Sequence, residues 1–161
     1  TSQDGQRFVG VSARDVGDGR IMLRTEFVHP TENQLWTEVQ TLMRSTPRPV
    51  LAVTPGLKIH VPPELDAAAI QVGYAELEKW TALAGSMIQD GRIIHPGQLT
   101  LSEHLNRAVA VKSNSGWTLS SQKSPGPIEL ARCAVWAAAL ATKPKWTSKP
   151  AMARAGARTR G

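Results

Sequence analysis

Three oxygen-bearing side chains occupy positions where an open α/β sheet builds its sites. Ser12 is the last residue of a strand predicted at 7–12, Thr54 follows a strand predicted at 50–53, and Glu129 lies in the first turn of the last predicted helix. Ligand sites in such sheets form at the carboxyl ends of the strands. Mg and Mn prefer oxygen ligands, and two ions about 3.5–4 Å apart stabilise the attacking and leaving oxygens of a phosphodiester. A two-metal site would need carboxylates that converge from such separate elements, and hydroxyl groups bind a hard dication far less well than carboxylates do.

The acidic candidates also have structural interpretations. Glu129 is either a metal ligand or an acid that favours the dipole at a helix start. Asp15, three residues after Ser12, is either a substitute ligand or, like Asp18, a residue that suits the hairpin turn. The histidines show no metal-ligand spacing, so we expect them to be structural; they are His29, His60, His95 and His104.

The elements that must position these residues follow from hydrophobic spacing and turn signals. Strands at 7–12 and 21–28 flank a Gly-Asp-Gly turn and predict a hairpin. A capping box at Thr31 opens a helix that ends before Pro49. The apolar run 50–53, bounded by prolines, predicts a central strand buried on both faces. Short helical turns at 63–69 and a strand at 70–72 follow.

The second half of the chain is predicted to be mainly helical. Residues 74–89 form an amphipathic helix, and 92–96 an extended piece. A second capping box at Thr100 opens another helix, and 109–113 and 117–120 form a hairpin-like excursion. Pro127 takes a favoured first position in an alanine-rich helix at 128–142. The order predicts one α/β domain over residues 1–142, with a mixed sheet flanked by helices.

The net charge of +6 lies entirely at the end of the chain. Residues 1–142 hold 13 Lys/Arg and 13 Asp/Glu, whereas residues 143–161 hold six basic residues and no acid. We predict that this tail is disordered, because it has too little apolar surface to fold. It is either an arm that meets phosphates, or a solvated linker toward another partner or a dispensable end. Trp146 within it either stacks on a base or anchors the tail to the body.

Several function classes are excluded or disfavoured by composition. No apolar stretch is long enough for a membrane span, and residues 1–20 lack the order of a signal peptide. Cys133 is the only cysteine, so neither an internal disulfide nor a cysteine-cluster zinc site is possible. No phosphate-binding loop of the ATPase kind is present.

A family resemblance rests on the second half of the chain. The segment DGRIIHPGQLTLSEHLNRA (90–108), the pair Gly116-Trp117 and the segment KSPGPIE (123–129) before an alanine-rich helix ending at Thr142 resemble the nuclease domain of phage terminase large subunits. Earlier in the chain, FVGVS (8–12) and VLAVT (50–54) match two strand positions of that family.

The resemblance implies an RNase H-like domain that cuts concatemeric double-stranded DNA with two Mg or Mn ions during genome packaging. It also implies an ATPase domain in the full-length protein, the terminase small subunit and the portal as partners, and the host cytoplasm as location, with no membrane association. The family's three acid positions fall on Ser12, Thr54 and Glu129, and only the third is a carboxylate. The implied ligands and catalytic residues are therefore Glu129 and Asp15. Candidate DNA contacts are Lys123, Lys143, Lys145 and Lys149.

Three functions follow from these observations. The first is a metal-dependent endonuclease that relies on Glu129 and Asp15. The second is a non-catalytic RNase H-like module that binds DNA or packaging partners, suggested by the hydroxyls of Ser12 and Thr54. The third is a structural protein of unrelated α/β fold whose basic tail docks on an acidic partner.

Overall fold

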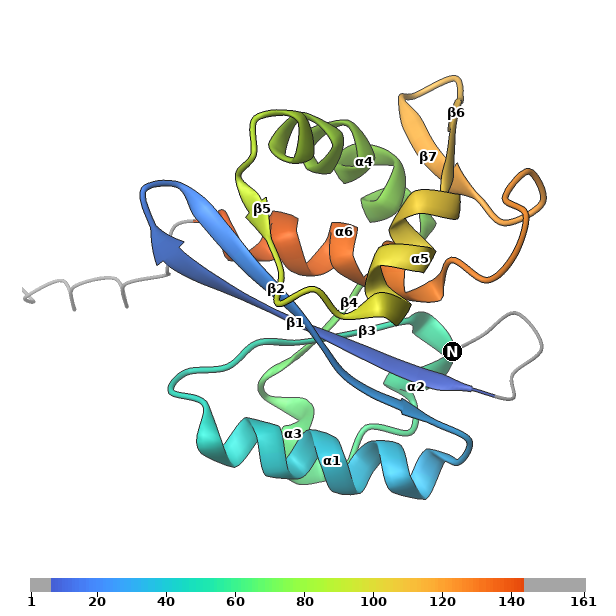
Figure 1. Ribbon diagram of the computed structural model, residues 1–161. Helices are drawn as coiled ribbons and strands as arrows, with labels where there is room; N and C mark the ends of the chain where they lie inside the picture. Colours follow the sequence, from blue (N-terminus) through green and yellow to red (C-terminus); the bar gives the residue numbers. More distant parts are fainter. Residues whose placement is uncertain (1–6, 144–161) are drawn as a thin grey trace, which may run out of the picture.

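A long antiparallel hairpin runs through the middle of the molecule (Figure 1). The computed structural model describes residues 7–143, and the hairpin consists of β1 (Phe8–Gly17) and β2 (Arg20–His29). Its turn uses positive φ angles at Gly17, Asp18 and Gly19, which suit glycine and are tolerated by aspartate. The predicted hairpin is therefore confirmed, with both strands longer than expected.

A bulge interrupts the pairing of the two strands. Gly10 pairs with Phe27 and Val11 with Thr25, so Glu26 is an extra residue on β2. Such a bulge leaves one residue outside the ladder and can re-aim its side chain.

The remaining strands form short pairings around this hairpin. β5 (Ile93–Ile94) adds in parallel to β2 and makes a three-stranded mixed sheet. β3 (Leu51–Val53) pairs in parallel with β4 (Ala69–Gln71), and β6 (Val109–Lys112) pairs antiparallel with β7 (Trp117–Ser120). The α/β class and the mixed sheet are confirmed.

The expectation of a central strand at 50–53 is wrong. Among the described residues β3 is hydrogen-bonded to β4 alone, so it forms an edge of a two-stranded sheet. Val50 is 62% exposed, and Val53 is the one fully buried residue of β3. An apolar run bounded by prolines was consistent with burial on both faces, but the sequence did not determine which strand it would pair with.

Helices cover both faces of the hairpin (Figure 1). On one side lies α1 (Glu32–Ser45), with α2 (Pro55–Lys58) and α3 (Pro63–Asp66). On the other side lie α4 (Tyr74–Gln89), α5 (Leu99–Arg107) and α6 (Glu129–Ala141). The hydroxyl of Thr31 accepts a hydrogen bond from the backbone N–H of Gln34, which confirms the predicted start of α1.

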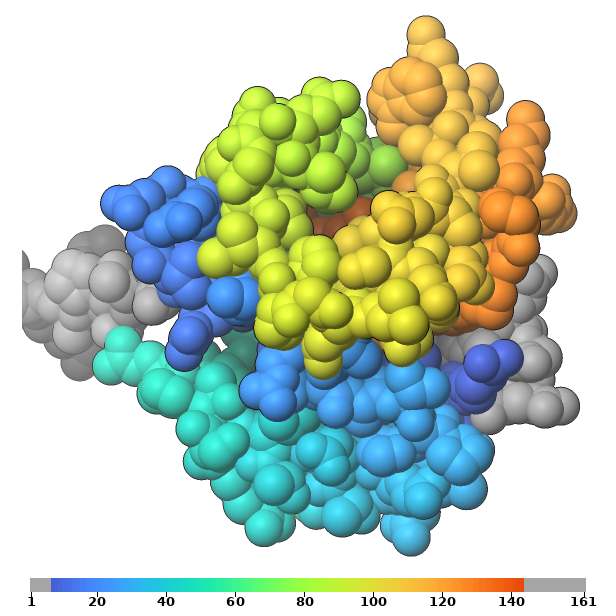
Figure 2. All heavy atoms as spheres, in the orientation of Figure 1, coloured from blue at the N-terminus to red at the C-terminus, as the bar shows by residue number. Residues whose placement is uncertain are grey.

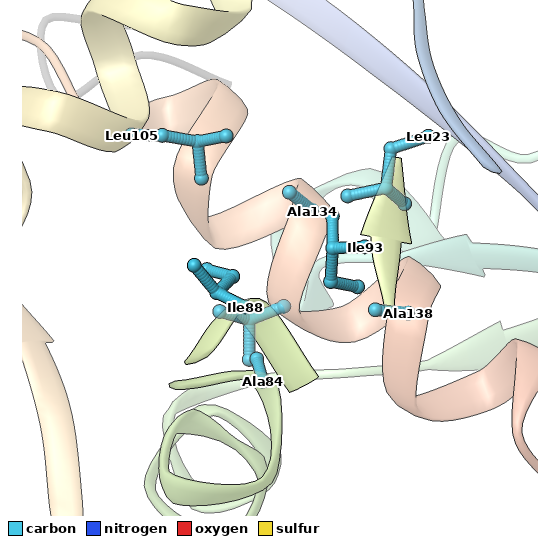
Figure 3. A pocket seen from close by; sticks show the side chains of 8 residues that line it. Leu23, Ala84, Ile88, Ile93, Leu105, Ala134 and Ala138 are labelled. Carbon is cyan, nitrogen blue, oxygen red and sulfur yellow. The ribbon is translucent and has the colours of Figure 1, made fainter. Parts of the chain in front are cut away.

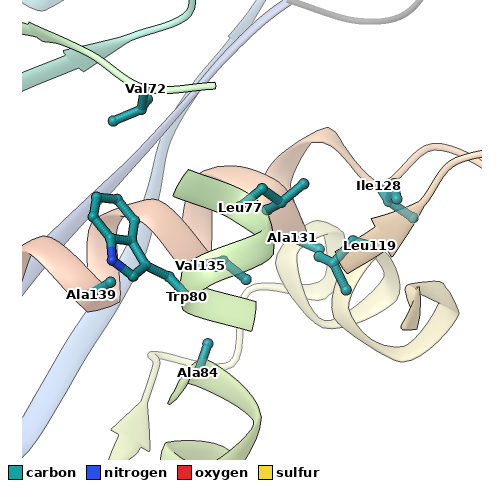
Figure 4. Packing of buried hydrophobic residues seen from close by; sticks show 9 residues of the cluster. All are labelled: Val72, Leu77, Trp80, Ala84, Leu119, Ile128, Ala131, Val135 and Ala139. Atoms are coloured by element: carbon teal, nitrogen blue, oxygen red, sulfur yellow. The ribbon is translucent and has the colours of Figure 1, made fainter. Parts of the chain in front are cut away.

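Alternation along β1 divides the core between these two sides. Val9, Val11 and Ala13 pack with α6 and α5, because alternate residues of a strand share a face. Phe8 lies on the opposite face and packs beside Phe27 with α1. A third cluster joins α4, β7 and α6 around Trp80 (Figure 4). The side chains of even-numbered β1 residues therefore point away from α6.

Two helix starts differ from the prediction. α5 begins at Leu99 after Gln98, and no side chain caps it. The amide of Gln98 instead bonds both to the backbone N–H and to the carbonyl of Thr25 on β2, at 2.7 and 2.9 Å. This tertiary contact fixes the entry to α5, so Thr100 falls inside the helix. The residue before α6 is Ile128, and Pro127 therefore precedes the helix rather than opening it.

Two expectations, the basic tail and the absence of a membrane span, can be compared with residues 7–143 alone. The predicted tail lies outside the described residues except for Lys143. Within residues 7–143, none of the helices combines the length and apolar character that crossing a bilayer requires.

Candidate functional site

Ser12 lies in the middle of β1 rather than at a strand end. Its hydroxyl is exposed and donates a hydrogen bond of 2.5 Å to the carboxylate of Glu26, the bulge residue of β2. The Glu26 side chain is only 14% exposed, and the Arg24 guanidinium lies 3.8 Å from it. The bulge therefore aims a carboxylate at the Ser12 hydroxyl.

Two arginines accompany Ser12 on the same face of the hairpin. Arg24 is the cross-strand partner of Ser12, and Arg14 follows Ser12 by two residues. Both arginines are exposed, and Arg14 forms no ion pair within residues 7–143. We call Ser12, Arg14, Arg24 and Glu26 the Ser12 face. Alternation along the strand would have grouped Arg14 with Ser12, but the register that brings Arg24 and Glu26 to them requires the structure.

Glu129 lies on the other side of the sheet, at the start of α6. Its carboxylate is 4.0 Å from Nδ1 of His104, and the two side chains are 14% and 11% exposed. His104 Nδ1 accepts a hydrogen bond of 3.3 Å from the backbone N–H of Leu130. His104 thus satisfies a free N–H group at the start of α6, where the preceding residue provides no side-chain cap.

The protonation of His104 is shifted by this environment. Burial lowers the pKa of His104 from its usual value of 6.5, Glu129 opposes that effect, and Arg107 and Arg7 add to it. A neutral ring is also what the hydrogen bond from Leu130 requires, because Nδ1 must act as the acceptor. The structure therefore gives His104 the structural role that we expected.

Thr54 lies at the amino end of α2, directly after β3. Its carbonyl accepts hydrogen bonds from the N–H groups of Leu57 and Lys58, and its side chain makes no cap. Leu57 packs in the same cluster as Phe8. Thr54 therefore lies toward the end of the hairpin at which β1 begins.

Asp15 lies toward the opposite end of the hairpin. Its carboxylate accepts a hydrogen bond of 2.9 Å from the N–H of Gly17, as expected for a turn residue. Asp15 is seven positions after Phe8, and a rise of about 3.3 Å per residue places them roughly 23 Å apart. α6 runs in the same direction as β1 (Figure 1), so Glu129 lies near the start of β1, close enough to Arg7 for the pKa effect on their shared neighbour His104. The structure does not bring Asp15 and Glu129 together.

These donors do not fit a two-metal centre. Within residues 7–143, no group of three or more His, Cys, Asp or Glu side chains is placed to hold a metal ion. Ser12 is hydrogen-bonded to Glu26, Asp15 to the hairpin turn, and Glu129 lies beside His104 on the other side of the sheet. Two neutral hydroxyls at the expected acid positions cannot supply the charge that two dications need.

The predicted DNA contacts do not gather around one point. Lys123 is exposed in the loop before α6, and Lys143 follows the end of that helix, which is about 20 Å long at 1.5 Å per residue. The ammonium of Lys143 lies 4.6 Å from the centre of the Trp80 ring, in cation–π contact. Lys145 and Lys149 lie outside the described residues.

A small hollow among β2, α4, α5, β5 and α6 offers no alternative site. It measures about 20 Å³, and its lining side chains are all hydrocarbon, among them Leu23, Ile88, Ile93 and Leu105 (Figure 3). Such a space holds one water at most and lacks the polar groups that would orient a substrate.

Comparison of the chain with protein-family models, with curated proteins and with solved structures finds no match.

Proposed function

We propose that this chain is an RNase H-like module of terminase-nuclease descent that binds double-stranded DNA during packaging without cutting it. The supporting observation is the Ser12 face. Where the resembling family places a metal-binding carboxylate, this chain has a hydroxyl that is bonded to Glu26 and flanked by two exposed arginines.

Guanidinium groups replace part of what metal ions do for a phosphodiester. A guanidinium binds phosphate oxygens through two parallel N–H bonds and keeps its charge at any physiological pH. It does not generate a hydroxide nucleophile, which is one of the main contributions of a metal ion in hydrolysis. Arg14 and Arg24 therefore favour binding of the DNA backbone over its cleavage.

The same proposal includes further DNA contacts, the partner proteins and the location of the module. The basic residues after α6 add phosphate contacts, and Lys123 adds one beside the start of α6. In the full-length context we place the protein in the host cytoplasm, beside the terminase small subunit and the portal.

The test is a salt series with labelled duplex DNA, followed by fluorescence anisotropy. Each phosphate contact contributes about 0.9 to the slope of log K against log salt, so the double variant Arg14→Ala/Arg24→Ala should lower the slope by about 1.8. The control Arg44→Ala removes an exposed charge on α1 and should leave the slope unchanged. Equal slopes for the parent and the double variant would overturn this assignment of the DNA contact.

A plasmid-nicking assay with Mn separates binding from cleavage. We expect no nicking by the parent protein above the level of Glu129→Gln. Nicking by the parent that is lost in Glu129→Gln would establish the nuclease instead, and calorimetry that detects two bound Mn ions would support the same conclusion.

A further inference from the structure

A groove lies between α4 and the β6–β7 hairpin, on the side of the central sheet opposite the Ser12 face. Its volume is about 320 Å³, within the range of ligand sites. Ala75, Lys79 and Ala82 of α4 line one wall, and Ser115 and Trp117 line the other. In Figures 1 and 2 the β6–β7 hairpin stands out from the body beside α4.

Specific contacts hold the two walls in place. The hydroxyl of Ser113 donates a hydrogen bond to the carboxylate of Glu78 on α4. Gly116 lies so close to α4 that an added Cβ would come within 3.2 Å of the Glu78 carbonyl oxygen. Leu119 of β7 packs beside Leu77 in the core of the domain. The fold therefore holds both walls of the groove in place, and its acid, Glu78, is already hydrogen-bonded to Ser113.

An exposed indole and a lysine of the groove wall, with a second lysine on the adjacent hairpin, define the chemistry here. Trp117 is 46% exposed although tryptophan is costly to leave in water. Lys112 is its cross-strand partner and lies beside it on the same face of the hairpin. Lys79 is exposed on the opposite wall, and Tyr74, 62% exposed, lies one helical turn before Glu78.

We infer that this groove binds an unpaired segment of nucleic acid, with a base stacked on Trp117 and phosphates at Lys79 and Lys112. A base stacks on an aromatic ring without regard to its sequence, and lysines follow the backbone. The bases of an intact duplex are stacked on one another, so their faces cannot reach a side chain inside a groove. The site therefore selects single strands, whereas the Ser12 face contacts the duplex, and neither assignment depends on the other.

The test measures the affinity of the full chain for a fluorescein-labelled oligothymidylate of about eight nucleotides, by anisotropy. Trp117→Ala should weaken binding about tenfold, and Trp117→Phe, which keeps a ring, should stay within about threefold of the parent. Lys79→Ala should lower the salt slope by about 0.7, the contribution of one single-strand phosphate. Binding of a labelled duplex should be unchanged in all three variants.

Equal oligothymidylate affinity for the parent and Trp117→Ala would overturn the inference, provided that both unfold at the same temperature. Should the alanine variant lose stability, the same comparison is made with Lys79→Ala, whose side chain is exposed. A loss confined to single strands supports the groove even if the arginine variants show no effect on duplex binding. If the Trp117 and Lys79 variants lose affinity only for duplex DNA, the single-strand site in the groove is refuted, and the proposal for the Ser12 face is unaffected.

Discussion

Replacing Gly10 by alanine should destabilise the protein although it adds a single methyl group. Gly10 lies opposite Phe27 at the bulge, and a Cβ on Gly10 would stand 2.4 Å from two carbons of that ring. Ordinary contact begins at 3.4 Å, so the ring must withdraw by about 1 Å. Phe27 is 8% exposed and stacks on His29 with 5.2 Å between ring centroids, so it has little room to move.

Overpacking of this kind costs about 1–3 kcal/mol. With a urea dependence of about 1–3 kcal/mol per molar, a loss near 2 kcal/mol moves the unfolding midpoint down by roughly 1 M. Phe27→Leu removes the clashing atoms, so the double variant should lose less than the sum of the two single variants, with a coupling of about 1 kcal/mol or more.

The matched control is the same substitution in α4. An added Cβ at Gly85 meets no atom within 4 Å, and alanine is the better helix former, so Gly85→Ala should raise stability by about 0.5–1 kcal/mol. Urea unfolding followed by circular dichroism measures all four variants. If Gly10→Ala is neutral, or its cost simply adds to that of Phe27→Leu, the close approach of the ring to β1 is refuted.

Three further outcomes follow from the structure. Burial lowers the pKa of His104, so near pH 6.5 the unfolded chain binds a proton at this histidine and the folded chain does not. The free energy of unfolding should therefore fall as pH drops below about 6.5. His104→Asn retains an acceptor for the start of α6 and should flatten that slope in urea titrations, whereas an unaltered slope would assign the effect to other groups. Ser12→Asp places a second carboxylate at hydrogen-bond distance from Glu26, so we expect it to be less stable than Ser12→Asn at pH 7 and closer to it at pH 4, and a pH-independent difference would contradict this. Desolvation at its partly buried position raises the pKa of Cys133 to about 11, so its thiol should be alkylated more slowly at pH 8 in the folded chain than in urea; equal rates would contradict this.

Local rules account for most of the elements of this fold. The hairpin turn needs three residues that tolerate positive φ, and its Gly-Asp-Gly sequence supplies them. The bounds of α4 follow from helical spacing between Gly73 and Asp90, and α1 begins at its capping threonine. Signals of this kind involve residues only a few positions apart, so the sequence displays them directly.

Long-range pairing decided the rest, including the candidate site. The apolar run at 50–53 forms a strand as expected, but only the fold pairs it with β4 instead of the central hairpin. Gln98 lies 73 residues from Thr25, and their contact moves the start of α5 away from the capping box at Thr100. Such contacts depend on which surfaces remain to be buried after the local elements form, and no local pattern encodes that choice.

The sequence by itself determined the α/β class, the order of the elements apart from the short helix α2, and the presence of hydroxyls at Ser12 and Thr54 and of acids at Asp15 and Glu129. Only the tertiary structure decided what those hydroxyls and acids do. The bulge on β2 turns Glu26 toward Ser12, the length of β1 separates Asp15 from Glu129, and the packing of α5 places His104 beside the start of α6. Register and packing bring together residues that are far apart in the chain, so the chemistry of this surface is a property of the fold.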